Sequence, residues 1–405
     1  MDLDLIFLNF AEVSPAQVDG LAAAAGQGRL EEVESMLQLP QDPDLPSYGF
    51  RPLGCAAYAG HLQAAALLLE AGAAPCGLST GSDGGTPLMM AAGRGHTEMV
   101  RLLLAAGVEK DPVNIHSGKT ALMNASENGH VEVVHLLLEA GADVNVKDPC
   151  GCSGHTALIL AAMQPHVKVL RLLLEASADK NLADDNGCTA LMAASFKGHV
   201  EVVRLLLDVG ARQDLADDSG MTALMLAAGV CHVEVLRSLL GAGADQSLVD
   251  SAFMVVLGRR HFEAFRLLLN AGASKDLADA SGRTALMLAA EQCQLELLRL
   301  LLEAGADKNL ADNNGYTALM VAWTVEALRL LLAAGASTDL VDNKGNTALM
   351  LASSKGQVEH VRLLLDAGAN KDVANDNGST ALSMAISQGH SQVELLLQQG
   401  VGADK

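Results

Sequence analysis

The chain has 405 residues; half are apolar, 3% are aromatic, and 48 acidic against 27 basic residues give a formal net charge of −21. This length is about two to three times that of a usual domain, and the Ala-, Leu- and Gly-rich composition favours one array of small helical units. The acidic balance argues against nucleic acid and anionic membrane as partners, because phosphate contacts need clustered Lys and Arg. The same charge favours solubility and can attract a basic partner protein, two roles that charge alone does not separate.

Residues 1–14 are apolar at Leu3, Ile6 and Phe10, and we predict that they pack on the first unit as an N-terminal cap. Their start is acidic where a secretory signal needs positive charge, and no stretch reaches the ~18 apolar residues of a membrane span. The seven cysteines are an odd number without a framework of paired spacings, which indicates reduced thiols. We therefore predict a soluble, cytoplasmic chain without membrane insertion, and the nucleus stays open as a location.

A regular repeat occupies nearly all of the remaining chain. Residues 15–50 hold a degenerate first unit and a Pro-rich loop, and residues 51–405 hold the repeat array. The units are marked by Thr-Ala-Leu or a variant of it, beginning near residues 51, 86, 120, 156, 189, 222, 251, 284, 317, 347 and 380. Self-similarity at a period of about 33 residues predicts stacked units, each unable to bury its apolar face alone.

The unit at residues 184–211 shows how each repeat is expected to fold. Thr189 is placed to cap a short helix through its hydroxyl, and Gly198 can supply a left-handed turn. The Leu-rich run after Val200 gives a second amphipathic helix that Gly210 ends. The preceding Asp/Asn/Gly run reads as a hairpin loop. The predicted fold is an all-α solenoid of about twelve helix-turn-helix units joined by short hairpin loops.

The unit resembles the ankyrin repeat, whose pattern is D-x-x-G-x-T-P-L-H-x-A-A-x-x-G-H followed by a Leu-rich helix and G-A-D. Here Met replaces the first His of the pattern, and we expect these Met side chains to form an apolar core stripe in place of that His's inter-repeat hydrogen bonds. They are Met89, Met123, Met192, Met225, Met254, Met287, Met320 and Met350. The resemblance implies a curved array whose ligands bind on its concave face.

Two units depart from the period. Four residues are missing before Ser251, so the hairpin there should be short or absent. Three residues, including Gly-His, are missing just after Trp323, which shortens the turn between two helices. Either change can shape a pocket or bend the stack, and neutral drift explains them equally well.

Three patterns in the sequence contain residues that could bind a phosphate or a metal or act in catalysis. Ser117-Gly118-Lys119-Thr120 is similar to the end of a phosphate-binding loop, but Val113 stands where that motif needs Gly. Cys150, Cys152, His155 and Cys188 contain soft-metal ligands whose places on neighbouring units are too far apart for one zinc without distortion. The His residues after Gly recur once per unit, which a structural role explains. We predict no enzyme activity, cofactor, metal or small-molecule substrate; a catalytic alternative would need residues 1–85 or 145–156.

The resemblance places ligand contacts at two variable positions of each unit. The first lies between Gly and Thr: Lys119, His155, Cys188, Met221, Arg283, Tyr316, Asn346 and Ser379. The second is the pair before Gly-His: Tyr58, Ala59, Gly93, Arg94, Glu127, Asn128, Phe196, Lys197, Glu291, Gln292, Ser354, Lys355, Ser387 and Gln388. From these rows and the deletion site we predict contacts at Tyr58, Lys119, Phe196, Lys197, Arg283, Tyr316 and Trp323, because aromatic and basic side chains contribute most at interfaces.

These observations predict a non-catalytic scaffold or adaptor that binds partner proteins, with a basic partner favoured by charge. The alternative is a regulatory or targeting subunit for an enzyme carried on another chain. The sequence does not separate the two.

Overall fold

The computed structural model describes residues 20–38, 42–44, 46, 50–76, 85–148, 153–257 and 261–399. Within these ranges the regular elements are 24 helices, α2 to α25, and extended backbone forms only isolated bridges. The all-α prediction is confirmed. The predicted cap at residues 1–14, most of the Pro-rich loop, and Cys150 and Cys152 lie outside the described residues. None of the helices in the described ranges is long and apolar enough to cross a bilayer.

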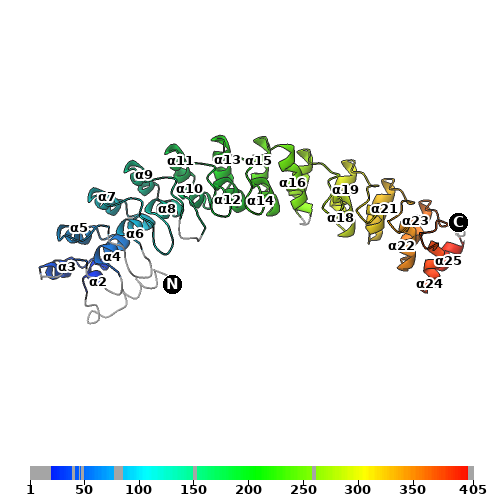
Figure 1. Cartoon of the computed structure of the whole chain (residues 1–405), viewed down its shortest axis with the longest axis horizontal. Coiled ribbons are helices and arrows are strands. Elements are labelled where there is room, and N and C mark those ends of the chain that lie inside the picture. Colours follow the sequence, from blue (N-terminus) through cyan, green and yellow to red (C-terminus); the bar gives the residue numbers. More distant parts are fainter. Residues whose placement is uncertain are drawn as a thin grey trace. The chain divides into compact units, whose positions relative to one another are not determined.

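The chain divides into two compact units. Residues up to Ala227, with Arg237–Ala242, form the first, and Ala228–Leu236 with residues from Gly243 onward form the second. Figure 1 labels the helices of both units along the chain.

Each repeat contributes a first and a second helix. The first helices, which start the repeats, are α2 (Leu21–Gly26), α4 (Pro52–Ala59), α6 (Pro87–Arg94), α8 (Ala121–Glu127), α10 (Ala157–Ala162), α12 (Ala190–Lys197), α14 (Ala223–Gly229), α16 (Gln246–Leu257), α18 (Ala285–Glu291), α20 (Ala318–Val321), α22 (Ala348–Ser354) and α24 (Ala381–Ser387). The second helices are α3 (Leu30–Leu37), α5 (Leu62–Glu70), α7 (Thr97–Ala105), α9 (Val131–Glu139), α11 (Val167–Glu175), α13 (Val200–Asp208), α15 (Val233–Gly241), α17 (Phe262–Asn270), α19 (Leu295–Glu303), α21 (Val325–Ala333), α23 (Val358–Asp366) and α25 (Ser391–Gln399).

Within each unit the helices stack in two layers (Figure 1). In the first unit α2, α4, α6, α8, α10 and α12 contact one another in order, and α3, α5, α7, α9, α11 and α13 form the other layer. In the second unit α16 to α24 and α19 to α25 repeat the arrangement. Ala, Leu and Met side chains fill the first-helix layer and mainly Leu and Val fill the second, so neighbouring repeats within each unit share an apolar core.

Local sequence explains the ends of the helices. Thr189 Oγ1 accepts the Met192 N–H at 3.4 Å and caps α12, as predicted. Gly198 then takes a φ of 80°, in the left-handed region that favours glycine, and turns the chain into α13. The same Thr cap recurs at α6, α8, α10, α18 and α22.

Six of the eight Met side chains are buried as the predicted core stripe, whereas Met225 and Met254 are half-buried, and sulfur atoms of the column also take part in hydrogen bonding. Met89, Met123 and Met192 are almost fully buried. Each sulfur accepts the backbone N–H of the Thr three residues earlier, at 3.4 Å. Met therefore both packs the core and completes the helix cap, a polar role that its apolar character did not predict.

The two departures from the period have the predicted form. The hairpin before Ser251 is absent, because residues 246–250 are already the first turn of α16, which Asp245 caps by accepting the Leu248 N–H at 3.0 Å. After Thr317, α20 has only four residues, and the chain passes through Trp323 directly to the Thr324 cap of α21.

Candidate recognition surface

The residues predicted to contact a partner come from equivalent positions of successive repeats and form a row along each of the two compact units. We call this row the recognition face. It consists of the residue after each loop Gly, the last residues of each first helix with the residue that follows, and Trp323 in the connection between α20 and α21. In the first unit these include Tyr58, Arg94, Lys119, Glu127, Phe196 and Lys197; in the second they include Arg283, Glu291, Tyr316, Trp323 and Lys355.

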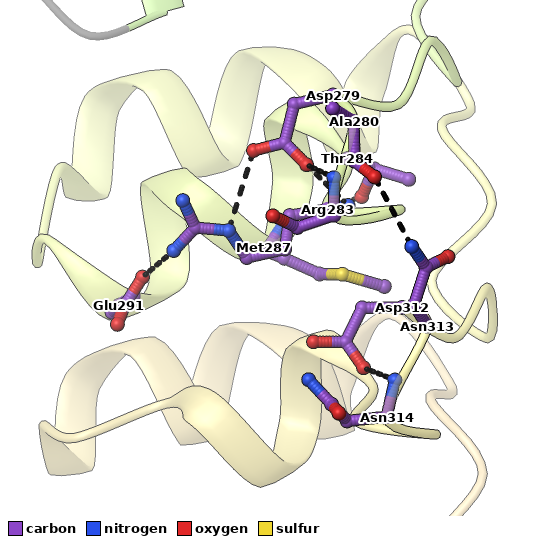
Figure 2. A network of polar contacts seen from close by, with 10 residues as sticks. Asp279, Ala280, Arg283, Thr284, Met287, Glu291, Asp312, Asn313 and Asn314 are labelled. Atoms are coloured by element: carbon purple, nitrogen blue, oxygen red, sulfur yellow. Dashed lines mark hydrogen bonds and ion pairs between the residues drawn. The ribbon is translucent and has the colours of Figure 1, made fainter.

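The side chain of an Asp holds several of the hairpin loops, as Figure 2 shows for the repeat that starts at Asp279, and Asn114 and Asn375 take this place in two others. Asp279 Oδ1 accepts the N–H groups of Ser281 and Arg283, at 2.8 and 3.0 Å. Burial alone would raise the pKa of Asp279, but these N–H donors and the Arg283 charge hold it below its ordinary value. The carboxylate therefore stays ionised and keeps the loop closed.

Successive loops are also joined to each other. Asn313 N–H donates to the Ser281 carbonyl at 3.0 Å, and Asn313 Nδ2 donates to the Ala280 carbonyl at 3.1 Å (Figure 2). In the first unit the Asp185 N–H likewise donates to the Ser153 carbonyl at 3.0 Å. Loop backbone thus supplies the inter-repeat polar ladder that the Met substitutions had put in doubt, and the recognition face is held rigid before any partner binds.

Two of the predicted basic contacts are tied to the adjacent helix by the same geometry. Lys119 Nζ lies 2.5 Å from Glu127 Oε2, and Arg283 Nη1 lies 3.3 Å from Glu291 Oε2. Arg283 Nε also contacts Asp279 Oδ2 at 3.3 Å. The paired carboxylates fix both cations in place and neutralise much of their charge.

Aromatic rings and cations pair three times on the recognition face. The Arg94 guanidinium lies 4.1 Å from the centre of the Tyr58 ring, and Lys355 Nζ lies 3.7 Å from the Trp323 ring. Lys197 Nζ is 6.0 Å from the ring of Phe196, which is 49% exposed. Each of these distances is within the range of a cation–π interaction. Arg94 and Lys355 were in the variable rows but not among our predicted contacts; their shared position with Lys197 was the signal.

Tyr316 is half-buried, and its N–H donates to Asp312 Oδ1 at 2.8 Å. It sits in the loop that follows α19, at the position that Arg283 occupies one repeat earlier. The predicted contacts are therefore grouped within each unit along its row rather than gathered at one point.

The metal and phosphate hypotheses gain no support from the described residues. His155 Nε2 lies 3.5 Å from Asp184 Oδ2 of the next repeat. Burial, with the nearby Asp184 and Asp217 carboxylates, raises the pKa of Cys188 to about 11, so its thiol stays protonated and is a poor metal ligand. No cluster of three metal-binding side chains occurs in the ranges that the structure describes. Thr120, the last residue of the phosphate-loop-like stretch, caps α8 instead.

The histidines after Gly have the structural role that their column predicted. His130 Nε2 lies 3.0 Å from the Gly93 carbonyl of the preceding repeat. His96, His166, His261 and His390 make the equivalent contact with a first-helix carbonyl, and His199 makes it with the carbonyl of Met163, directly after α10. These contacts join each repeat to the preceding one.

Comparison with known proteins agrees with this architecture. A sequence model described as ankyrin repeats in three copies matches residues 74–148, 158–250, 252–325 and 323–405, and one described as ankyrin repeats in many copies matches residues 21–69. The crystal structure of the human ASB11 ankyrin repeat domain is similar, with a TM-score of 0.50 and 29% sequence identity, covering 56% of this chain and 99% of that one. A comparison with curated proteins finds no match.

Ankyrin repeats are generally protein-binding modules and typically have no catalytic role. The matches to ankyrin repeats extend over most of the sequence and coincide with the helix pairs described above. The chain belongs to the ankyrin-repeat family.

Proposed function

We propose that this protein is a non-catalytic scaffold or adaptor that binds partner proteins on its recognition face. The observation that carries the proposal is a row of partly exposed aromatic and basic side chains on loops and helix ends that are fixed by hydrogen bonds. A rigid frame lowers the entropy lost when a partner binds, and aromatic and Arg side chains are enriched among residues that dominate binding energy.

The acidic net charge of −21 favours a partner with a basic surface. The proposal includes a cytoplasmic location, which rests on the unpaired cysteine spacing. A regulatory subunit that targets an enzyme on another chain would use the same face, and the identity of the captured partner separates the two.

The test is affinity capture from a cell lysate with the full chain and two variants. The recognition-face variant carries four substitutions: Tyr58→Ala, Phe196→Ala, Arg283→Ala and Tyr316→Ala. The control variant carries Arg101→Ala and Arg266→Ala, exposed side chains on second helices. After equal helicity is confirmed by circular dichroism, we expect a saturable partner that the control retains and the recognition-face variant loses. Equal capture by all three proteins would refute the proposal.

A further inference from the structure

The repeat that starts at Thr317 exposes an aromatic ring beside a cation of the next repeat. Because α20 ends at Val321, Trp323 lies in a short non-helical connection and keeps 47% of its surface exposed. Lys355, the residue directly after α22 of the next repeat, places its ammonium 3.7 Å from the centre of the indole ring. The deletion has thus put an exposed aromatic side chain beneath a cation.

Lys355 differs from the other basic residues of the recognition face in the second unit. Arg283 is paired with two carboxylates, whereas no carboxylate of the described residues lies within ion-pair range of Lys355. Partial burial lowers the pKa of Lys355 below its ordinary value, while the side chain as a whole stays exposed and open to a ligand. The chain has 48 acidic and 27 basic residues, yet none of the described carboxylates pairs with this ammonium. An anion from another molecule can therefore bind Lys355 without displacing a carboxylate of the chain.

We propose that Trp323 and Lys355 bind an acidic segment of a partner protein, in which an Asp or Glu carboxylate pairs with Lys355 and a neighbouring apolar side chain covers the exposed part of Trp323. This deepens the proposed function and rests on it. A partner with a basic surface can carry such a segment, because at physiological salt the repulsion from the chain's other acidic residues is screened beyond about 8 Å.

The same pairing recurs in the first unit. Arg94, which lies over Tyr58, and Lys197, which lies beside Phe196, occupy the position of Lys355, directly before the glycine of the turn into the second helix. An acidic and apolar segment is therefore a ligand type that suits this row wherever the pairing occurs.

The chain offers its own probe, because Trp323 is its only tryptophan. A display library of random twelve-residue peptides would be selected on the full chain, and the enriched peptides titrated against it while Trp323 fluorescence is recorded. We expect Asp or Glu beside an aromatic or large aliphatic residue, and a saturable fluorescence change.

One variant tests the role of the Lys355 charge, and two others serve as controls. Lys355→Met keeps the aliphatic stem and removes the charge, and should weaken peptide binding about tenfold, the value of one charge-assisted hydrogen bond. Lys355→Arg should bind as wild type, and so should Lys168→Met, which alters an exposed lysine of α11. Enriched peptides without a carboxylate, an unchanged Trp323 signal, equal binding to Lys355→Met, or no enrichment would overturn the proposal.

Failure of this inference is distinguishable from failure of the proposed function. If a lysate partner is lost from the recognition-face variant but binds Lys355→Met as tightly as wild type, the scaffold function is supported and the acidic-segment site is refuted. If no partner depends on the recognition face, the proposed function itself falls.

Discussion

Ser177 provides a test of how the fold uses left-handed backbone. It ends the turn after α11 with a φ of 66°, where the next repeat has Gly210 with a φ of 77°. A left-handed conformation costs an L-residue about 1–2 kcal/mol. Replacing it with glycine removes this cost, but the greater freedom of glycine in the unfolded chain reduces the gain in stability by about 0.5–1 kcal/mol. Ser177→Gly should therefore raise the free energy of unfolding by about 0.5–1 kcal/mol.

Gly210→Ser is the matched reciprocal change, because a Cβ at Gly210 would meet nothing within 4 Å. It should destabilise the chain by a similar amount, and the double variant should lie near wild type. Urea denaturation followed by circular dichroism measures the shifts, and hydrogen exchange of α11 and α13 amides localises them. A loss of stability in Ser177→Gly, or no change in either single variant, would refute the reasoning.

Three further changes test individual contacts. His130→Ala removes the inter-repeat bond to a first-helix carbonyl and should lower the free energy of unfolding by about 1–2 kcal/mol in urea melts, against little change for the exposed His135→Ala. Ser195 is fully buried and its hydroxyl has no partner, so Ser195→Ala should raise the thermal midpoint by the equivalent of about 1 kcal/mol; a lower midpoint would show that the hydroxyl is bonded. Burial lowers the pKa of His360 below its ordinary 6.5, so the folded chain binds fewer protons there than the unfolded chain. The contribution of neutral His360 to the free energy of unfolding is therefore fully present near neutral pH and is lost as the pH falls below about 6.5. The urea midpoint should fall less steeply with decreasing pH for His360→Val than for wild type. Equal slopes of midpoint against pH would contradict this.

Sequence predicted the parts of the fold that depend on local chemistry. The Thr caps, the glycine turns, the missing hairpin before Ser251 and the short turn after Val321 all follow from residues within a few positions of one another. The exact start of α16 at Gln246 was missed, because Asp245 caps a helix turn where other repeats form a loop.

Contacts between repeats were harder to foresee. Arg329 stands three residues after Glu326 on its own helix, a spacing that favours an ion pair, but it reaches Glu359 of the next repeat at 3.1 Å. The position of Lys355 over Trp323 likewise depends on how two neighbouring repeats stack when one of them lacks three residues. Spacing along the chain identifies such residues as candidates, but only stacking decides which of them meet.

The identity of the partner-binding face is the central claim, and hydrogen exchange of the full chain with and without a captured partner tests it most directly. The account predicts added protection in the hairpin loops and at the ends of the first helices, around residues such as Phe196 and Arg283. Protection confined to the second helices, with the loops unchanged, would contradict it.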